Sequence, residues 1–211
     1  IMDQSEKNSL KSEFYFMAGK TAGYGSGYDV FSPRIQRLLA LIHERGHIIG
    51  LHPSYGTLGC PDLLKTEAAN LRKAMDAAGA KQGLYNGRQH YLRWHAECTW
   101  PDWEKAGLEI DSSVGFAQHV GFRAGTCRDY PAWSWQEGRQ INVTERPLIA
   151  MEGSLVSEKY MAVPLETAIG QLKMLSEIIK FFSGEFVVLW HNDSVMSLKG
   201  SYKKLLDECY R

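Results

Sequence analysis

The sequence is organised around the stretch Gly46-His47-Ile48-Ile49-Gly50-Leu51-His52-Pro53-Ser54. A helical pattern ends at Gly46, and the apolar run that follows is typical of a short buried strand ending at His52. In folds that alternate strands with helices, functional residues gather at the carboxyl ends of the strands. His52 is therefore placed to bind a metal or to move a proton, or simply to cap backbone groups at the end of the strand.

The rest of the chain alternates between segments with a strand pattern and segments with a helix pattern. Strands are predicted over 12–19, 47–52, 108–110, 147–151 and 186–190, and residues 121–126 form a further strand or a substrate loop. Helices are predicted over 1–10, 33–46, 63–78, 100–106, 164–182 and 201–210, and a loop over 20–28. This alternation favours an α/β fold with a parallel sheet or barrel over an all-α or all-β fold.

Composition narrows the class of protein. The 211 residues fit a single domain over 1–211. The chain has 24 Lys and Arg against 24 Asp and Glu, so no excess of charge points to nucleic acid or an anionic membrane as a partner. No apolar run approaches the roughly 20 residues that span a bilayer. The four cysteines lack zinc or disulfide spacing, which indicates reduced thiols and a cytoplasmic location.

Three predicted strand ends carry an ionisable side chain, namely His52, Asp111 and His191. Two histidines and a carboxylate on one rim, with Arg88 close by, are able to bind a divalent metal and activate a water molecule. His191 follows a rigid hydrophobic strand and suits the role of proton donor. Arg88 suits the orientation of a carboxylate, because its guanidinium is a fixed fork.

Each of these roles has a structural alternative. His191 is also suited to a hydrogen bond with Asn192 or Asp193, and Arg88 to a surface ion pair.

A set of aromatic residues offers an indication of sugar binding, because aromatic faces stack on sugar rings. Most of the set must nevertheless serve core or lid packing. The set comprises Tyr91, Trp94, Trp100, Trp103, Tyr130, Trp133, Trp135 and Trp190, of which one or two are expected to contact a sugar.

Several of these segments resemble the polysaccharide deacetylases, the NodB-homology group of carbohydrate esterases. Residues 46–54 resemble that group's GHEIGNHT segment, and residues 14–19 its ATFFVTG strand. Residues 88–91 stand where the family has an Arg-x-Pro-Tyr motif. Residues 107–113 are similar to the GFRYDSS segment of an exopolysaccharide-associated branch, and residues 188–192 to the closing strand with its catalytic histidine. The similarity is collinear and covers nearly the whole chain.

The resemblance implies a distorted, incomplete (β/α) barrel of the NodB-homology type. It also implies removal of N-acetyl or O-acetyl groups from a glycan, in bacterial polysaccharide biosynthesis or modification, with a divalent metal that is usually zinc. In such enzymes an Asp-His-His triad holds the metal, a second aspartate is the general base, and a late histidine is the general acid.

The family's roles carry over by position. His52 is expected to be a metal ligand, Arg88 to orient the base, and His191 to act as general acid. Tyr91 is expected at the oxyanion and the substrate pocket. Asp111 is expected to support the histidine or the rim, and Trp190 to contact the substrate together with Tyr91.

The sequence also departs from the family pattern. The family's paired aspartates precede its first helix, so we expect the chain to be a fragment whose first strand lies upstream. Gly56 stands where the second metal histidine belongs. His90 replaces the proline of the Arg-x-Pro-Tyr motif, and from there it could supply the missing ligand.

Two alternatives to a deacetylase stay open. One is a degenerate relative that binds a glycan without catalysis, and the other is a hydrolase of another C–N bond such as a cyclic amide.

Overall fold

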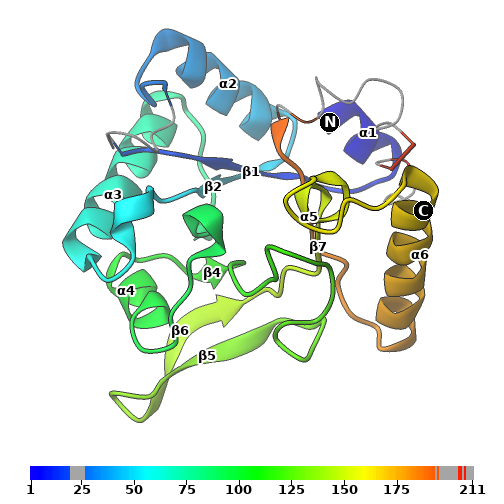
Figure 1. Cartoon of the computed structure of the whole chain (residues 1–211). Helices are drawn as coiled ribbons and strands as arrows, with labels where there is room; N and C mark the ends of the chain where they lie inside the picture. Colours follow the sequence, from blue (N-terminus) through cyan, green and yellow to red (C-terminus); the bar gives the residue numbers. More distant parts are fainter. Residues whose placement is uncertain (20–26, 193, 195–203, 206, 208–211) are drawn as a thin grey trace. The chain divides into compact units, whose positions relative to one another are not determined.

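The computed structural model describes residues 1–19, 27–192, 194, 204, 205 and 207 (Figure 1). The predicted loop over 20–28 and the predicted terminal helix over 201–210 lie largely outside the described residues. The chain divides into two compact units. The first comprises 1–113 and 131–145, and the second comprises 114–130 and 146–211. The prediction of one domain over the whole chain stays a prediction.

The first unit is built on a six-stranded sheet with the order β1-β2-β3-β4-β6-β5. Its strands are β1 (Glu13–Phe16), β2 (Ile48–Leu51), β3 (Asn86–Gly87), β4 (Ile110–Asp111), β5 (Tyr130–Ser134) and β6 (Arg139–Glu145). The pairs β1–β2, β2–β3, β3–β4 and β4–β6 are parallel. The chain is therefore an α/β protein with a mainly parallel sheet, as its sequence predicts.

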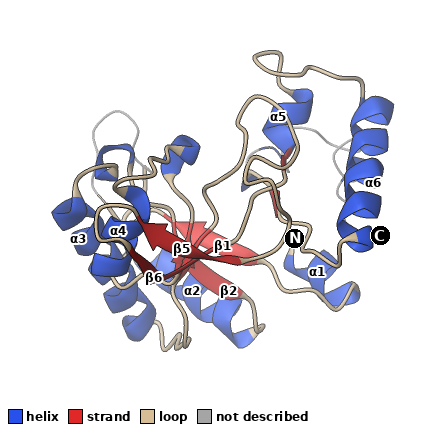
Figure 2. Cartoon of the chain, turned by 90° about the horizontal axis from the view of Figure 1, so that it is seen from below, coloured by secondary structure: helices blue, strands red, loops and turns tan. Residues whose placement is uncertain are grey.

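The helices of this unit connect consecutive parallel strands (Figures 1 and 2). They are α2 (Pro33–Glu44), α3 (Pro61–Ala77) and α4 (Thr99–Lys105), and α2 contacts α3, which contacts α4. Proline at the start of α2 and α3 costs no hydrogen bond, because the first amides of a helix have no intrahelical acceptor. The helices α2 and α3 bury an apolar face, which includes Leu39 and Ile42 in α2 and Leu64, Ala68, Leu71 and Met75 in α3. The short helix α4 buries five consecutive residues, Thr99 to Trp103.

Two glycines set the close approach of β1, β2 and β3. A Cβ on Gly87 would lie 2.2 Å from the backbone oxygen of Leu51, and one on Gly50 would lie 2.4 Å from Cδ1 of Tyr15. Any larger residue at Gly87 would push its own strand away from β2. The strands at the centre of the sheet are therefore able to approach closely because Gly50 and Gly87 have no side chains.

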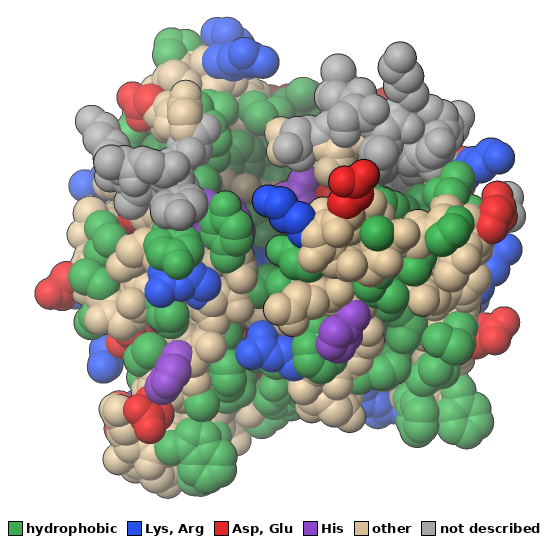
Figure 3. Space-filling model, viewed as in Figure 1, with side chains coloured by type: hydrophobic (Ala, Val, Ile, Leu, Met, Phe, Trp, Pro, Cys, Tyr) green, Lys and Arg blue, Asp and Glu red, His purple; other side chains and the backbone are tan. Residues whose placement is uncertain are grey.

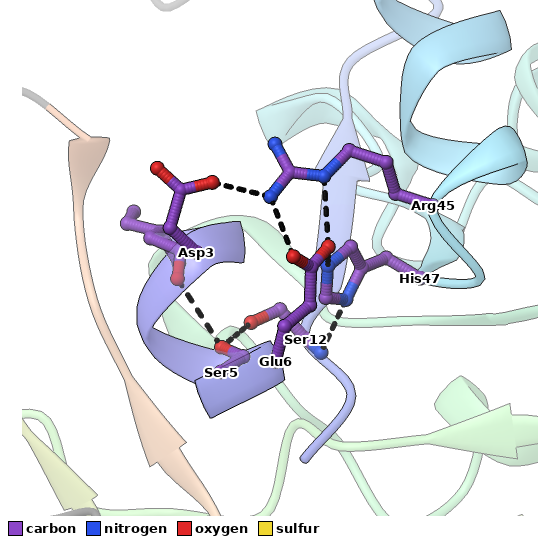
Figure 4. Close-up of polar contacts among 7 residues, drawn as sticks. Asp3, Ser5, Glu6, Ser12, Arg45 and His47 are labelled. Atoms are coloured by element: carbon purple, nitrogen blue, oxygen red, sulfur yellow. Dashed lines mark hydrogen bonds and ion pairs between the residues drawn. The ribbon is translucent and has the colours of Figure 1, made fainter. Parts of the chain in front are cut away.

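The short helix α1 (Met2–Lys7) is tied to the turn before β2 by a polar network (Figure 4). Arg45 donates from Nε to Oε1 of Glu6 at 2.8 Å and also pairs with Asp3. The Nδ1 atom of buried His47 accepts the backbone N–H of Ser12 at 3.1 Å, and its Nε2 atom lies 3.3 Å from Glu6. His47 therefore has a structural role in fixing the start of β1.

The second unit contains a two-stranded parallel sheet, and its described residues include the helices α5 and α6. Its elements are β7 (Ala150–Met151), α5 (Glu152–Val156), α6 (Leu165–Phe181) and β8 (Val188–Leu189). Their core includes Leu155, Ala168 and Leu172. Residues 121–126, predicted as a strand or a substrate loop, form turns and loop without a strand.

Two features of the sheet differ from a regular barrel. The strands β5 and β6 form a hairpin joined by residues 135–138, which the sequence did not indicate. In the described part of the chain the six-stranded sheet is open, with β1 and β5 at its edges.

None of the helices described is long and apolar enough to cross a membrane.

Candidate functional site

Polar side chains follow the parallel strands at one edge of the six-stranded sheet. Gly87 at the end of β3 pairs with Leu51 at the end of β2 and with Asp111 at the end of β4. His52 and Arg88 therefore leave their strands side by side, next to Asp111. This edge is where an α/β fold places its functional residues.

Arg88 is buried and held by the segment that follows β4. Its Nε atom donates to the backbone oxygen of Ser112 and its Nη2 atom to the Ser112 hydroxyl, both at 2.7 Å. Its Cζ atom lies 5.0 Å from the centre of the Tyr15 ring. Arg88 is therefore not a surface ion pair, which was the structural alternative.

Asp111 forms a carboxyl pair with Glu145, the last residue of β6, and both side chains are fully buried. Trp100 donates from Nε1 to Oε2 of Glu145 at 3.1 Å, and the Ser113 hydroxyl donates to Oδ1 of Asp111. Burial raises the pKa of Asp111 to about 7, against the opposing effects of Ser113, Glu145, Trp100 and the Arg88 charge. With this raised pKa, Asp111 is partly protonated near neutral pH.

His52 is oriented by the backbone of Arg88. Its Nδ1 atom donates to the Arg88 carbonyl oxygen at 2.7 Å, so a neutral ring carries its lone pair on Nε2. The turn after His52 rests on Glu67, a buried residue of α3 that accepts from the backbone N–H of Ser54 at 2.8 Å and from its hydroxyl. Burial raises the pKa of Glu67 against these two hydrogen bonds.

His90 lies beside His52, as the proposed ligand pair requires. The two ring centres are 4.9 Å apart, and Tyr91 stacks on His90 at 4.6 Å with an interplanar angle of 16°. Tyr91 and Leu92 both have left-handed backbone conformations, with φ of 58° and 52°. Strained non-glycine residues of this kind gather at functional sites.

The described residues contain no group of three His, Cys, Asp or Glu side chains arranged to hold a metal ion. His52 and His90 thus offer two of the three or four protein ligands that zinc sites have. The residues present fit part of a metal site and do not complete one.

The second unit holds an acid–histidine pair. Glu152, which begins α5, is almost fully buried, and its Oε1 atom accepts from Nδ1 of His191 at 2.7 Å, from the His191 backbone N–H at 2.9 Å and from the Ser194 hydroxyl at 2.9 Å. Burial acts to raise the pKa of Glu152, but His191 and Ser194 together hold it below its usual value. His191 is therefore held by a glutamate that is distant in the sequence. Asp193, one of the two partners in the structural alternative, lies outside the described residues.

The aromatic set divides by exposure. Trp100 and Trp103 are core residues, and Trp190 packs against the core of the second unit. The most exposed members are Trp135, Tyr91 and Trp133, at 70%, 59% and 43%. On the face drawn in Figure 3, acidic and basic side chains lie interspersed, in agreement with the formal net charge of zero.

Comparison with known proteins gives one informative likeness. No protein-family model and no curated protein matches the sequence. A crystal structure from Mycobacterium smegmatis, of a protein assigned as a polysaccharide deacetylase, matches 99% of this chain and 67% of its own with a TM-score of 0.66 and 13% identity. The two proteins share a fold. The likeness supports the α/β fold expected from the sequence and, at such low identity, it leaves substrate and metal dependence to be tested.

Two functional candidates, Glu145 and Glu152, were not expected from the sequence. Glu152 directly follows the predicted strand over 147–151. An ionisable residue at the end of a predicted strand, the signal that indicated His52, was therefore present there too. Glu145 ends a strand of alternating polar and apolar residues and carried no such signal.

Proposed function

We propose that the chain is a deacetylase that removes N-acetyl or O-acetyl groups from a glycan, in bacterial polysaccharide biosynthesis or modification. We also propose that its open parallel sheet is part of a distorted, incomplete (β/α) barrel of the NodB-homology type. The observation that carries the proposal is the row of His52, Arg88 and Asp111 at the ends of adjacent parallel strands, in a fold shared with a protein assigned as a polysaccharide deacetylase.

His191 is proposed as the general acid. Deacetylation breaks a C–N or C–O bond, and the leaving amine or alcohol needs a proton as that bond breaks. The Glu152 carboxylate receives the Nδ1–H of His191, which fixes the ring and stabilises its protonated form. His191 is half exposed, with 52% of its side chain accessible, so a substrate is able to reach it.

Arg88, Asp111 and Tyr91 are proposed to shape the binding edge. The buried guanidinium of Arg88 fixes Ser112, and the backbone of Tyr91 is proposed to contribute to binding the oxyanion and its ring to contact the sugar. Trp190, in the second unit, is proposed as a further residue that contacts substrate. Asp111 keeps this edge in register through its pairings with Gly87 and Glu145.

A divalent metal, with zinc as the first candidate, is proposed as cofactor, with His52 and His90 as two of its ligands. When bound, such an ion polarises the acetyl carbonyl and lowers the pKa of its bound water. Zinc binding is testable directly by calorimetry with zinc chloride on the wild type, on His90→Gln and on the control His95→Gln. Loss of zinc affinity in His90→Gln alone supports the assignment, and unchanged affinity contradicts it.

The function is tested by acetate release from oligomers of N-acetylglucosamine and from O-acetylated xylan fragments, with zinc chloride or with a chelator. We expect release by the wild type, and a loss of about 100-fold or more in His191→Asn. The matched control is His119→Gln, which changes an exposed histidine of the same unit. Activity that survives in His191→Asn contradicts the proposed role of His191.

The second candidate function is glycan binding without catalysis. It is favoured by Gly56 at the position of the expected second metal histidine and by the incomplete ligand set among the described residues. Binding of the same oligosaccharides with no acetate release under any metal condition would establish this function in place of the first.

A further inference from the structure

A continuous row of aromatic rings leads from the strand edge to an arginine. We name it the ring row, and it consists of His52, His90, Tyr91, Tyr55 and Arg93. His52 lies 4.9 Å from His90, His90 stacks on Tyr91 at 4.6 Å, and Tyr91 meets Tyr55 edge to face at 5.9 Å. The guanidinium of Arg93 lies 3.8 Å above the Tyr55 ring centre. All five residues belong to the first unit.

Arg93 is held in place without a counterion. Its Nη1 atom donates to the backbone oxygen of Tyr55, and its flat face rests on the Tyr55 ring. The edge formed by Nε and Nη2 makes no hydrogen bond with the residues the structure describes, and none of their carboxylates pairs with Arg93. Arg45, Arg139 and Arg146, by contrast, each bind two carboxylates.

The outer half of the ring row is open to solvent. Tyr91 is 59% exposed and Tyr55 is 38% exposed. Exposed tyrosine rings present an apolar face with a polar tip, which suits a sugar ring with its apolar C–H face and its hydroxyl groups. The contacts of the ring row hold these faces at fixed angles, so little side-chain freedom is lost when a sugar binds.

We propose that the ring row binds an acidic sugar, with the sugar ring against Tyr91 and Tyr55 and its carboxylate on the Nε–Nη2 edge of Arg93. A planar carboxylate matches two parallel N–H groups, and such paired, charge-assisted bonds are strong and directional. This inference rests on the proposed function and deepens it. It makes the substrate a glycan in which a uronic acid lies next to the residue that is deacetylated.

A polyanion such as nucleic acid is a poorer match to the same feature. Such polymers are bound through many phosphate contacts, each made by a cation. The ring row offers one cation, in a chain whose formal net charge is zero. A single carboxylate per binding site is the ligand that these groups satisfy.

The test measures binding by calorimetry, in the presence of a chelator so that no metal contributes. The two probes have equal length; one alternates glucuronic acid with N-acetylglucosamine and the other contains N-acetylglucosamine alone. We expect the wild type to bind the acidic probe about 10-fold more tightly or better, with a preference that falls as salt is added. Arg93→Gln should bind both probes about equally.

Two further variants keep the test decisive. Arg34→Gln removes an exposed arginine of α2 and should retain the wild-type preference. Arg93→Lys keeps the charge but loses the two parallel N–H groups, so its preference should fall between those of the wild type and Arg93→Gln. The inference is overturned if the wild type shows no preference, or if the preference survives in both Arg93 variants.

The binding test of the acidic-sugar site and the acetate-release test of the proposed function can fail independently of each other. Acetate release from neutral oligomers with no acidic preference would overturn the acidic-sugar site and leave the deacetylase proposal intact. An acidic preference that depends on Arg93, with no acetate release from any probe, would support the site and overturn the deacetylase.

Discussion

The pKa values of two buried acids in this chain are shifted in opposite directions. Asp111 at the end of β4 and Glu152 at the start of α5 are both almost completely removed from water. The pKa of Asp111 is raised, because burial outweighs the hydrogen bonds from its neighbours and the charge of Arg88. The pKa of Glu152 is lowered, because hydrogen bonds from His191 and Ser194 and the charge of His191 outweigh burial. The balance between burial and the partners of the carboxyl group decides whether a buried acid keeps its charge.

This difference assigns different tasks to the two acids. Asp111, with its raised pKa, retains a proton to a higher pH than an ordinary aspartate, in a buried pair with Glu145 that joins two strands. Glu152 keeps a negative charge under a half-exposed imidazole, as a residue that orients a proton donor does.

The largest expected effect is on the charged acid. Glu152→Gln keeps the size of the side chain but removes the charge that stabilises protonated His191. We expect kcat for acetate release to fall about 100-fold or more with little change in KM, because the interaction acts on proton transfer. Steady-state kinetics across pH check this, with Glu158→Gln, an exposed residue of the same unit, as control. An unchanged kcat would show that the two acids do not differ in function.

The next effect tests the strand spacing beside the Asp111–Glu145 pair. Gly87→Ala would place a Cβ 2.2 Å from the backbone oxygen of Leu51, so β2 and β3 must separate. We expect the free energy of unfolding in urea to fall by about 1–3 kcal/mol. Gly83→Ala is the matched control, since its added Cβ meets nothing within 4 Å. Equal stability of the two variants would contradict the close packing at Gly87.

Asp111→Asn tests the sign of the pH dependence. A carboxyl with a raised pKa stabilises the fold below the pKa of the unfolded chain, and this contribution is lost as the pH rises. For Asp111 the loss should run from about pH 4, its unfolded value, to about pH 7. We expect thermal melts between pH 4 and 8 to show this decline in the wild type and a weaker one in Asp111→Asn.

Glu152 should show the opposite dependence. Its pKa is lowered, so its contribution is present above the unfolded pKa and is lost as the pH falls through the folded value. Asp62→Asn, at an exposed position of α3, is the control for both acids and should leave the pH profile unchanged. A profile for Asp111→Asn that matched this control would remove the distinction between the two acids.

The smallest expected effect concerns Trp100, the donor that binds Glu145 of the Asp111–Glu145 pair. Trp100→Phe removes the N–H that Glu145 accepts and leaves a buried oxygen without that partner. We expect a loss of about 1–2 kcal/mol in the free energy of unfolding by urea. Trp135→Phe changes a residue that is 70% exposed and should cost almost nothing. Equal costs would mean that the hydrogen bond to Glu145 contributes little.

The parallel part of the fold was readable from the sequence. Apolar runs that stop at a polar residue predict β2 and β4, and the edge that holds His52 and Asp111 follows from parallel pairing. The helices α2, α3, α4 and α6 lie within about two residues of their predicted bounds, because proline and glycine mark several of their ends.

The partners of these side chains were not readable in the same way. Glu145 is separated from Asp111 by a hairpin whose strands alternate polar and apolar residues, so no apolar run marked its strand. Glu152 lies 39 residues before His191, and only the parallel pairing of β7 with β8 brings the two together. Local patterns predict where a strand ends, whereas a hydrogen bond between distant strand ends depends on the packing of the whole unit.

The left-handed backbone at Tyr91 has a consequence for how this protein would change under selection. A non-glycine residue in that conformation costs about 1–3 kcal/mol, and the exposed ring of Tyr91 gains little from burial in return. Selection for heat resistance alone would favour glycine or asparagine at this position, since both adopt a positive φ more readily. Persistence of tyrosine in populations grown at high temperature would therefore report a demand for the ring itself.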